Sequence, residues 1–151
     1  MSASEAASDP LQLDSQLCFP LYAATNLLQR LYRPLLEPLG LTYSQYLVML
    51  VLWQRSPVPI GGLCERLHLD IGTLSPLLKR MERADLITRR RDVTDERRVL
   101  IDPTARGRAL RDRAVPIPAE IASRTGMSTA EADDLRALMP GLITKLARAP
   151  A

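Results

Sequence analysis

Cys18 is the side chain of this 151-residue chain best placed to do chemistry. Proline is tolerated only in the first turn of a helix, so Pro20 predicts that an apolar helix over about residues 19–32 begins just before it and ends around Pro34 and Pro38. Cys18 then lies at a helix N-terminus, where unpaired backbone N–H groups and the helix dipole favour the thiolate that attacks peroxides and disulfides. The alternative is a small buried hydrophobe between two apolar neighbours, and the residue types alone leave both open.

Several other chemistries are disfavoured by the composition. One histidine is too few for a histidine-based zinc site, and two distant cysteines without a secretory signal do not suggest a disulfide framework, so we expect no metal and no cofactor. The first ten residues are polar, and no apolar run reaches the length of a membrane span. We therefore expect a cytoplasmic protein without a membrane partner, with a disordered tail over residues 1–12.

Positive charge is concentrated in one segment. The whole chain has a net charge of +3, while residues 79–98 alone hold eight Lys and Arg against five Asp and Glu. A run of this kind is most often a solvated surface, so the charge gives only modest support to nucleic-acid binding.

The middle of the chain has the pattern of a helix-turn-helix. Thr42 and Gln45 form a capping box for a helix over residues 43–54, whose nearly uniform apolar content predicts a buried core helix. A turn signal at residues 56–59 precedes a short helix over residues 62–67, and a second helix runs from Asp70 to Asp85. Two short helices joined by a tight turn are a helix-turn-helix candidate, although such pairs are common in helical cores.

A β-hairpin and two further helices complete the expected fold, which is mainly α. Residues 86–91 and 98–101 predict two strands joined by a polar, charged loop. A helix follows from Thr104 to about Ala114, with a break at the two prolines that follow it. Ser128 and Glu131 then cap a last helix running towards Arg148.

This order of elements is that of a winged helix. In that arrangement the second short helix enters the major groove of DNA, and the hairpin tip reaches the adjacent backbone or minor groove. We expect contacts to DNA from residues of the second short helix and the hairpin, namely Thr73, Ser75, Lys79, Arg80, Arg89, Asp95 and Arg97. Asp95 lies two residues from Arg97 and could hold its guanidinium for a narrow minor groove, although the bland alternative is an ordinary exposed ion pair.

The hairpin and four further segments carry a family resemblance. The sequence from Leu86 to Arg89 followed by Asp95-Glu96-Arg97-Arg98 resembles the wing of the MarR family of winged helix-turn-helix repressors, which act as homodimers on near-palindromic operators. Residues 13–19, 32–36, 41–47 and 72–80 are similar to the organic hydroperoxide-sensing, OhrR-type branch, and the resemblance covers about residues 11–148.

The resemblance implies a division of the chain. Residues 13–148 are expected to form a single MarR-type domain. Residues 13–40 and 104–148 would supply the N- and C-terminal dimerisation helices, and residues 41–103 the winged-helix lobe that binds DNA.

The resemblance also implies a sensor. In the OhrR-type branch the N-terminal cysteine senses peroxide, and two tyrosines of the partner subunit hydrogen-bond to its sulfur. Cys18 matches that cysteine, Tyr32 and Tyr43 fall on the two tyrosine positions, and Tyr22 is similar to a further tyrosine near the site. Phe19 would line the same pocket and favour lipophilic peroxides.

Two kinds of departure from the branch are visible. Pro20 and Ile71 are not the residues expected at their positions, the second falling where a small polar residue often meets DNA. Some members also have a late resolving cysteine, whereas no cysteine follows Cys64 here, and Cys64 itself is expected to be a packed structural thiol.

The expected function is a redox-sensing repressor rather than an enzyme. Oxidation of Cys18 by an organic hydroperoxide, followed by a mixed disulfide with a low-molecular-weight thiol, would shift the lobes and release pseudo-palindromic operator DNA. One alternative is a MarR-type repressor released by a small aromatic acid, with Cys18 merely structural. A less favoured alternative is a thiol peroxidase, against which stand the basic wing and the missing resolving thiol.

Overall fold

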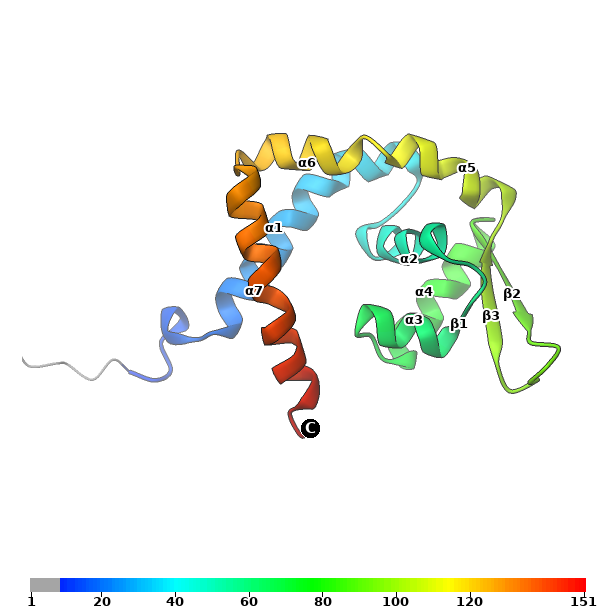
Figure 1. Ribbon diagram of the computed structural model, residues 1–151, viewed down its shortest axis with the longest axis horizontal. Coiled ribbons are helices and arrows are strands. Elements are labelled where there is room, and N and C mark those ends of the chain that lie inside the picture. The colour runs from blue at the N-terminus through cyan, green and yellow to red at the C-terminus, as the bar shows by residue number, and fades with distance from the viewer. Residues whose placement is uncertain (1–8) are drawn as a thin grey trace, which may run out of the picture. The chain divides into compact units, whose positions relative to one another are not determined.

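The computed structural model describes residues 9–151, which divide into two compact units, the first ending at Val115 and the second covering Pro116–Ala151 (Figure 1). The first eight residues of the expected disordered tail lie outside the described residues. At the start of the described chain, the backbone N–H of Gln12 donates to the carbonyl of Asp9 at 3.0 Å and closes a turn.

The first unit contains five α-helices and a small sheet among its described residues. In chain order its elements are α1 (Cys18–Leu36), α2 (Tyr43–Gln54), β1 (Val58–Pro59), α3 (Ile60–Leu67), α4 (Ile71–Arg83), β2 (Ile87–Arg91), β3 (Val99–Pro103) and α5 (Ala105–Ala114), with short 3-10 turns at Leu13–Ser15 and Glu37–Leu39. The mainly helical fold with a hairpin wing is therefore confirmed.

Helix α1 begins where Pro20 predicted, with Cys18 as its first residue. It passes through Pro34 and ends at Leu36, between the two prolines expected to stop it. Gly40 then adopts a φ of +69°, a left-handed conformation that favours glycine, and turns the chain towards α2.

Helix α2 is the core helix. Its predicted capping box is confirmed: the backbone N–H of Thr42 donates to Gln45 Oε1 at 3.0 Å, and that of Gln45 donates to Thr42 Oγ1 at 3.3 Å. Val48, Met49 and Leu52 are buried, and the helix contacts α1, α3, α4, α5 and β3. A helix surrounded on most sides has little amphipathic pattern, which explains its uniform apolar content.

The helix-turn-helix is formed by α3 and α4. Helix α3 starts at Ile60, two residues earlier than predicted, and ends at Leu67, after which His68 has a φ of 53°. The side chain of Asp70 accepts a hydrogen bond from the backbone N–H of Thr73 at 2.7 Å and so caps α4. Helix α4 buries one face in the core, made of Leu74, Leu77, Leu78 and Met81.

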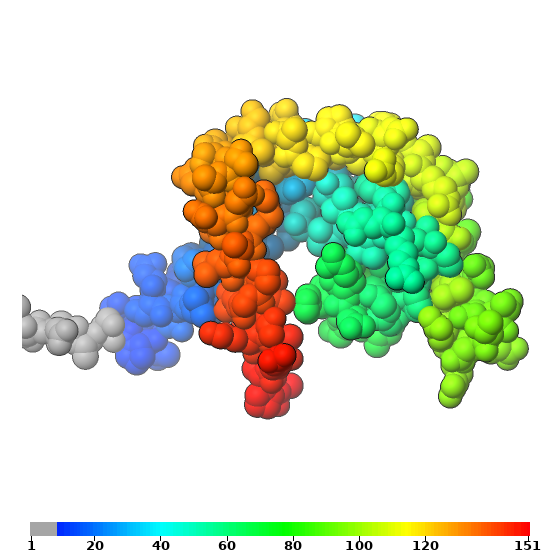
Figure 2. Space-filling model, in the orientation of Figure 1, coloured from blue at the N-terminus to red at the C-terminus, as the bar shows by residue number. Residues whose placement is uncertain are grey.

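The sheet has the antiparallel order β1-β3-β2. Strand β3 continues to Pro103, two residues beyond the prediction, and pairs with all five residues of β2. The prediction missed β1 because its two residues are strand only through their pairing with Leu100 and Ile101, a non-local partner. In Figure 2 the wing, coloured yellow-green, projects as a narrow extension of its unit.

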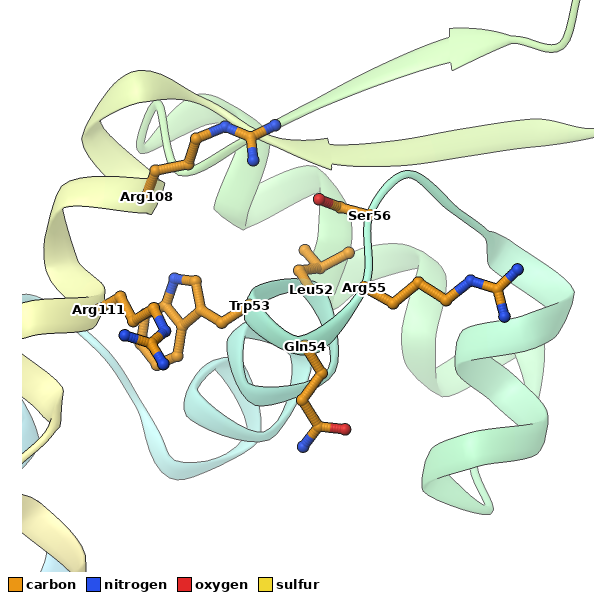
Figure 3. A pocket seen from close by; sticks show the side chains of 7 residues that line it. All are labelled: Leu52, Trp53, Gln54, Arg55, Ser56, Arg108 and Arg111. Carbon is orange, nitrogen blue, oxygen red and sulfur yellow. The ribbon is translucent and has the colours of Figure 1, made fainter.

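Helix α5 contacts the core helix α2 through Trp53, and it packs very closely against Leu86 at the base of the wing. The Trp53 indole N–H donates to the carbonyl of Gly107 at 3.0 Å. A Cβ added to Gly107 would lie 2.2 Å from the carbonyl oxygen of Leu86, so only glycine fits. A cavity of about 580 Å³ opens beside this contact, and its described lining contains none of the residues predicted as sensor or DNA contacts (Figure 3).

The second unit consists of α6 (Ile117–Thr125) and α7 (Thr129–Arg148). The break at Pro116 is confirmed, but Pro118 stands in the first turn of a further helix, a position where proline fits. The predicted capping box of α7 is present, since the backbone N–H of Ser128 donates to Glu131 at 2.7 Å and that of Glu131 donates to the Ser128 hydroxyl at 3.2 Å.

Within residues 9–151, no single helix is both long and apolar enough to cross a bilayer; only the pair Cys18–Leu39 and Tyr43–Gln54, bent by 69°, meets that test when taken together.

Candidate nucleic-acid interface and sensor residues

Helix α4 exposes several of the side chains predicted to contact DNA. Its buried face fixes the helix against the core, and this leaves Thr73, Lys79 and Arg80 exposed while Ser75 is half-buried. Thr73 and Arg80 are seven residues apart, which is two helical turns, so they share one side of α4. These hydroxyl and cationic groups are donors suited to base edges and phosphates.

The wing tip holds the predicted pair of Asp95 and Arg97. One carboxylate oxygen of Asp95 accepts hydrogen bonds from the Arg97 backbone N–H at 3.1 Å and from its Nε at 3.2 Å. The Arg97 side chain is 91% exposed, so its outer guanidinium nitrogens remain open to a ligand. Asp95 thus steers an arginine that stays available to solvent.

Asp92 is a wing residue that sequence reasoning missed. Its carboxylate is almost wholly covered and accepts hydrogen bonds from the backbone N–H and hydroxyl of Thr94 at 2.9 and 2.8 Å. The Arg98 guanidinium lies 3.6 Å away. These hydrogen bonds lower the pKa of Asp92. The bond from the Thr94 backbone N–H has the largest effect, and the bond from the Thr94 hydroxyl has the next largest. An Asp followed two residues later by Thr is the signal of such a turn.

Arg89 differs from the other predicted wing cations. It is half-buried, and its Nε donates to a carboxylate oxygen of Glu82 at 2.9 Å. This ion pair joins β2 to α4, so the structure places Arg89 where the wing meets α4 rather than at the wing tip.

Cys18 is exposed on the first residue of α1. The helix N-terminal position is as predicted, and the alternative of a buried hydrophobe does not hold within one chain. Phe19 is half-buried and Tyr22 is 68% exposed, so a single chain does not enclose the thiol in an apolar pocket.

Two of the predicted tyrosines, Tyr32 and Tyr43, lie together near the other end of α1, while Tyr22 stays near its start. The rings of Tyr32 and Tyr43 have centroids 5.0 Å apart, and that of Tyr46 lies 5.6 Å from Tyr32. Burial is the main cause that raises the pKa of all three phenols, which are therefore neutral donors at pH 7. Tyr46 was missed, although its spacing of three from Tyr43 puts both on one face of α2.

One chain does not bring Cys18 and the tyrosines together. Tyr32 follows Cys18 by fourteen residues of the same helix, about 21 Å at 1.5 Å per residue. Cys64 is half-buried on α3, in keeping with a packed thiol. Among residues 9–151, no three His, Cys, Asp or Glu side chains gather as a metal site would require.

The core helix, the helix-turn-helix and the three-stranded wing define a winged helix-turn-helix protein. The model of the MarR family matches residues 41–99. The chain is 45% identical to the organic hydroperoxide resistance transcriptional regulator of Bacillus subtilis (strain 168), over 91% of this chain and 92% of that protein. It is 46% identical to the HTH-type transcriptional regulator TtmR of Methylorubrum extorquens (strain PA1), over 89% of this chain and 67% of that protein. The chain belongs to the MarR family.

A solved structure of another protein has the same fold as this chain. Reduced AbfR bound to DNA superposes with a TM-score of 0.77 and 32% identity, covering 89% of this chain and 92% of that one. AbfR of Staphylococcus epidermidis has also been solved in an overoxidized form bound to DNA and in a disulfide form, with TM-scores of 0.72 and 0.59. The relatives are named as transcription regulators, which confirms the expectation of a regulator rather than an enzyme.

Proposed function

We propose that this protein is a repressor that leaves its operator when an organic hydroperoxide oxidises Cys18. The observation that carries the proposal is the exposed thiol at the first residue of α1, in a chain 45% identical to a regulator of organic hydroperoxide resistance. The reduced, overoxidized and disulfide forms of AbfR support a cysteine as the regulated group. A regulator of this kind acts on chromosomal DNA, and hence in the cytoplasm.

Binding to DNA would use α4 and the wing. Helix α4 enters the major groove with Thr73, Lys79 and Arg80, and Arg97 reaches the adjacent minor groove. Two copies of the chain, related by two-fold symmetry, would read a pseudo-palindromic operator, with half-sites about one helical turn apart.

A homodimer would also complete the sensor. Tyr32 cannot reach Cys18 of its own chain because about 21 Å of helix separates them. A second copy running antiparallel along α1 would bring its Tyr32 and Tyr43 to the thiol. The exposed side chains of Tyr22 and Leu27 on α1, and of Leu17 just before it, fit such an interface.

The redox step consumes one peroxide for each thiol. The Cys18 thiolate attacks the O–O bond, the sulfur takes one oxygen and becomes a sulfenate, and the peroxide leaves as an alcohol after taking up a proton. The sulfenic acid then condenses with a low-molecular-weight thiol to form a mixed disulfide and water. The added bulk beside α1 shifts the two lobes, and both recognition helices lose contacts together.

Matched serine variants test the proposal. Cys18→Ser should bind operator DNA like the parent and stay bound after treatment with cumene hydroperoxide, while Cys64→Ser should be released like the parent. Mass spectrometry with glutathione present should place the adduct on Cys18, and the oxidised protein should run as a monomer on non-reducing gels. Peroxide-driven release that persists in Cys18→Ser would overturn the redox mechanism, and a covalent dimer requiring both cysteines would overturn the one-cysteine form of it.

A further inference from the structure

A second cavity, of about 530 Å³, lies between the start of the helix-turn-helix and the wing. The first turn of α3, the first residue of α4 and the start of β3 line it, with side chains or backbone of Pro59, Ile60, Gly61, Gly62, Ile71, Arg97, Arg98 and Val99. The lining is therefore apolar along α3 and the start of α4, and it includes two arginines at the end of the wing loop.

Two side chains of this cavity are more exposed than their contacts within the chain explain. Ile71 is 56% exposed at the start of α4, although an apolar residue this large usually packs. Arg98 is held by Asp92 at 3.6 Å, yet half of its side chain stays exposed towards solvent. A guanidinium that Asp92 holds on one side, beside an exposed apolar wall, is arranged for a ligand that has both an anionic and an apolar part.

The position of the cavity indicates which ligand of this kind it would bind. The proposed function places α4 in the major groove and the Arg97 tip in the adjacent minor groove, and the present inference rests on that placement. One sugar-phosphate strand separates any two adjacent grooves of a duplex. A surface between the two inserted elements must therefore face that strand, and the cavity is that surface.

We propose that this cavity seats one sugar-phosphate unit of the operator strand that crosses between α4 and the wing. The Arg98 guanidinium binds the phosphate oxygens, and Ile71 and Val99 contact the apolar face of the deoxyribose. Contacts of this kind carry no base information, but they fix the register of the protein on the duplex. Ile71 thus contributes to binding at a position where a small polar residue was expected.

Neutralising single phosphates tests the assignment. The probe is a duplex selected from a random pool by the purified reduced protein, with methylphosphonate placed at one position of each half-site at a time. At the crossing position the parent should lose about 10-fold in affinity, the scale of one charged hydrogen bond. Arg98→Ala should lose a similar factor on the unmodified duplex and should not weaken further at that position. Its slope of log K against log salt should fall by about 0.9.

Control variants keep the test specific. Arg90→Ala removes the same charge from an exposed residue of β2 outside the cavity lining, and it should remain sensitive to the crossing methylphosphonate. Ile71→Asp should fold at least as well as the parent, because an acid suits the first turn of a helix. It should bind the charged duplex more weakly than Ile71→Asn does, and methylphosphonate at the crossing position should remove that difference.

The outcomes distinguish a failure of the proposed placement of α4 and the wing on DNA from a failure of the cavity assignment alone. If Arg97→Ala and Thr73→Ala leave binding unchanged, the proposed placement of α4 and the wing fails, and the cavity assignment fails with it. If those variants weaken binding but no phosphate position couples to Arg98, only the cavity assignment is overturned. Coupling of Arg98 to one position in each half-site supports it.

Discussion

The winged-helix lobe and the N-terminal end of α1 differ in how far one chain completes them. In the lobe, Asp92 and Asp95 have close partners within the same chain, the Leu86 carbonyl packs closely against Gly107 of α5, and the apolar face of α4 is buried. At the start of α1, Cys18 and Leu17 are exposed. The lobe therefore holds the groups proposed to contact DNA in place by itself, whereas the surroundings of the thiol would come from a second copy in the proposed dimer.

This difference separates binding from sensing. Changes within the lobe should alter affinity for DNA in the reduced and oxidised protein alike. Changes around Cys18 and the tyrosines should leave affinity in the reduced state intact and alter only the response to peroxide. Each variant below tests one side of that separation.

The largest expected effect is that of Gly107→Ala on the lobe. The new Cβ would stand 2.2 Å from the Leu86 carbonyl oxygen, which cannot retreat easily because it accepts a hydrogen bond from the Thr104 backbone N–H at 3.1 Å. Overpacking of this kind should lower the free energy of unfolding by about 3 kcal/mol. Calorimetry should show a thermal midpoint lower by roughly 10 °C.

Gly61→Ala is the matched control for that substitution. No described heavy atom outside the glycine's immediate surroundings lies within 4 Å of a Cβ at Gly61, and the residue lies inside α3. Alanine is preferred over glycine in a helix by up to about 1 kcal/mol, so the thermal midpoint should stay or rise. Equal losses at both glycines would show that the contact with Leu86 does not constrain the lobe.

Arg97→Ala should produce the next largest effect, on DNA binding alone. Loss of a groove-contacting arginine should weaken operator binding by about 1–3 kcal/mol, roughly 5- to 150-fold. The thermal midpoint should barely change, because the side chain is 91% exposed and exposed ion pairs contribute little to stability. Arg97→Lys should recover only part of the affinity, as it keeps the charge but not the fork of donors. Unaltered affinity of Arg97→Ala in a gel-shift titration at physiological salt would exclude this contact.

The sensor side gives a smaller effect, in Tyr32→Phe and Tyr43→Phe. Each removes one phenolic donor with little change in volume, so the rate at which peroxide oxidises Cys18 should fall about 3- to 10-fold, the worth of one hydrogen bond. Operator binding by the reduced protein should not change. Tyr46→Phe, in the same aromatic cluster, is the control and should oxidise at the parental rate. If all three variants match the parent in stopped-flow measurements, the tyrosines serve packing only.

Local signals made most of the secondary structure predictable from the sequence. The capping boxes at Thr42 and Ser128, the helix start beside Pro20 and the Asp95 to Arg97 pair depend on residues close together in the chain, and all four are present. Strand β1 was missed because only its pairing with β3 makes it a strand.

For the proposed sensor, the sequence predicted the residues but not the contacts between them. The residue types mark Cys18 as a helix-terminal thiol, but its proposed partners lie about 21 Å along the same helix and would come from another copy of the chain. The spacing of residues along one chain does not predict a contact between two chains. The family resemblance supplied that part of the prediction.

The smallest expected effect concerns Asp92, the wing carboxylate that sequence reasoning overlooked. Its pKa in the folded protein lies below the ordinary value, chiefly because the Thr94 backbone N–H donates to it. The ionised carboxylate therefore adds stability above the unfolded pKa, and this contribution disappears as the pH falls through the folded pKa. Asp92→Asn should lower the thermal midpoint slightly at neutral pH, and the difference from the parent should shrink below about pH 4.

Glu131→Gln provides the control, because hydrogen bonds from Ser128 likewise lower the pKa of Glu131, in the cap of α7. It should show the same dependence of the thermal midpoint on pH. The two variants should differ in DNA binding. Asp92→Asn weakens the hold on the Arg98 guanidinium and loosens the loop that presents Arg97, so its operator affinity at neutral pH should fall a few-fold, whereas Glu131→Gln should bind like the parent. Equal affinities for both variants would mean that the wing keeps its shape without the Asp92 carboxylate, and that the lobe is preformed by its backbone alone.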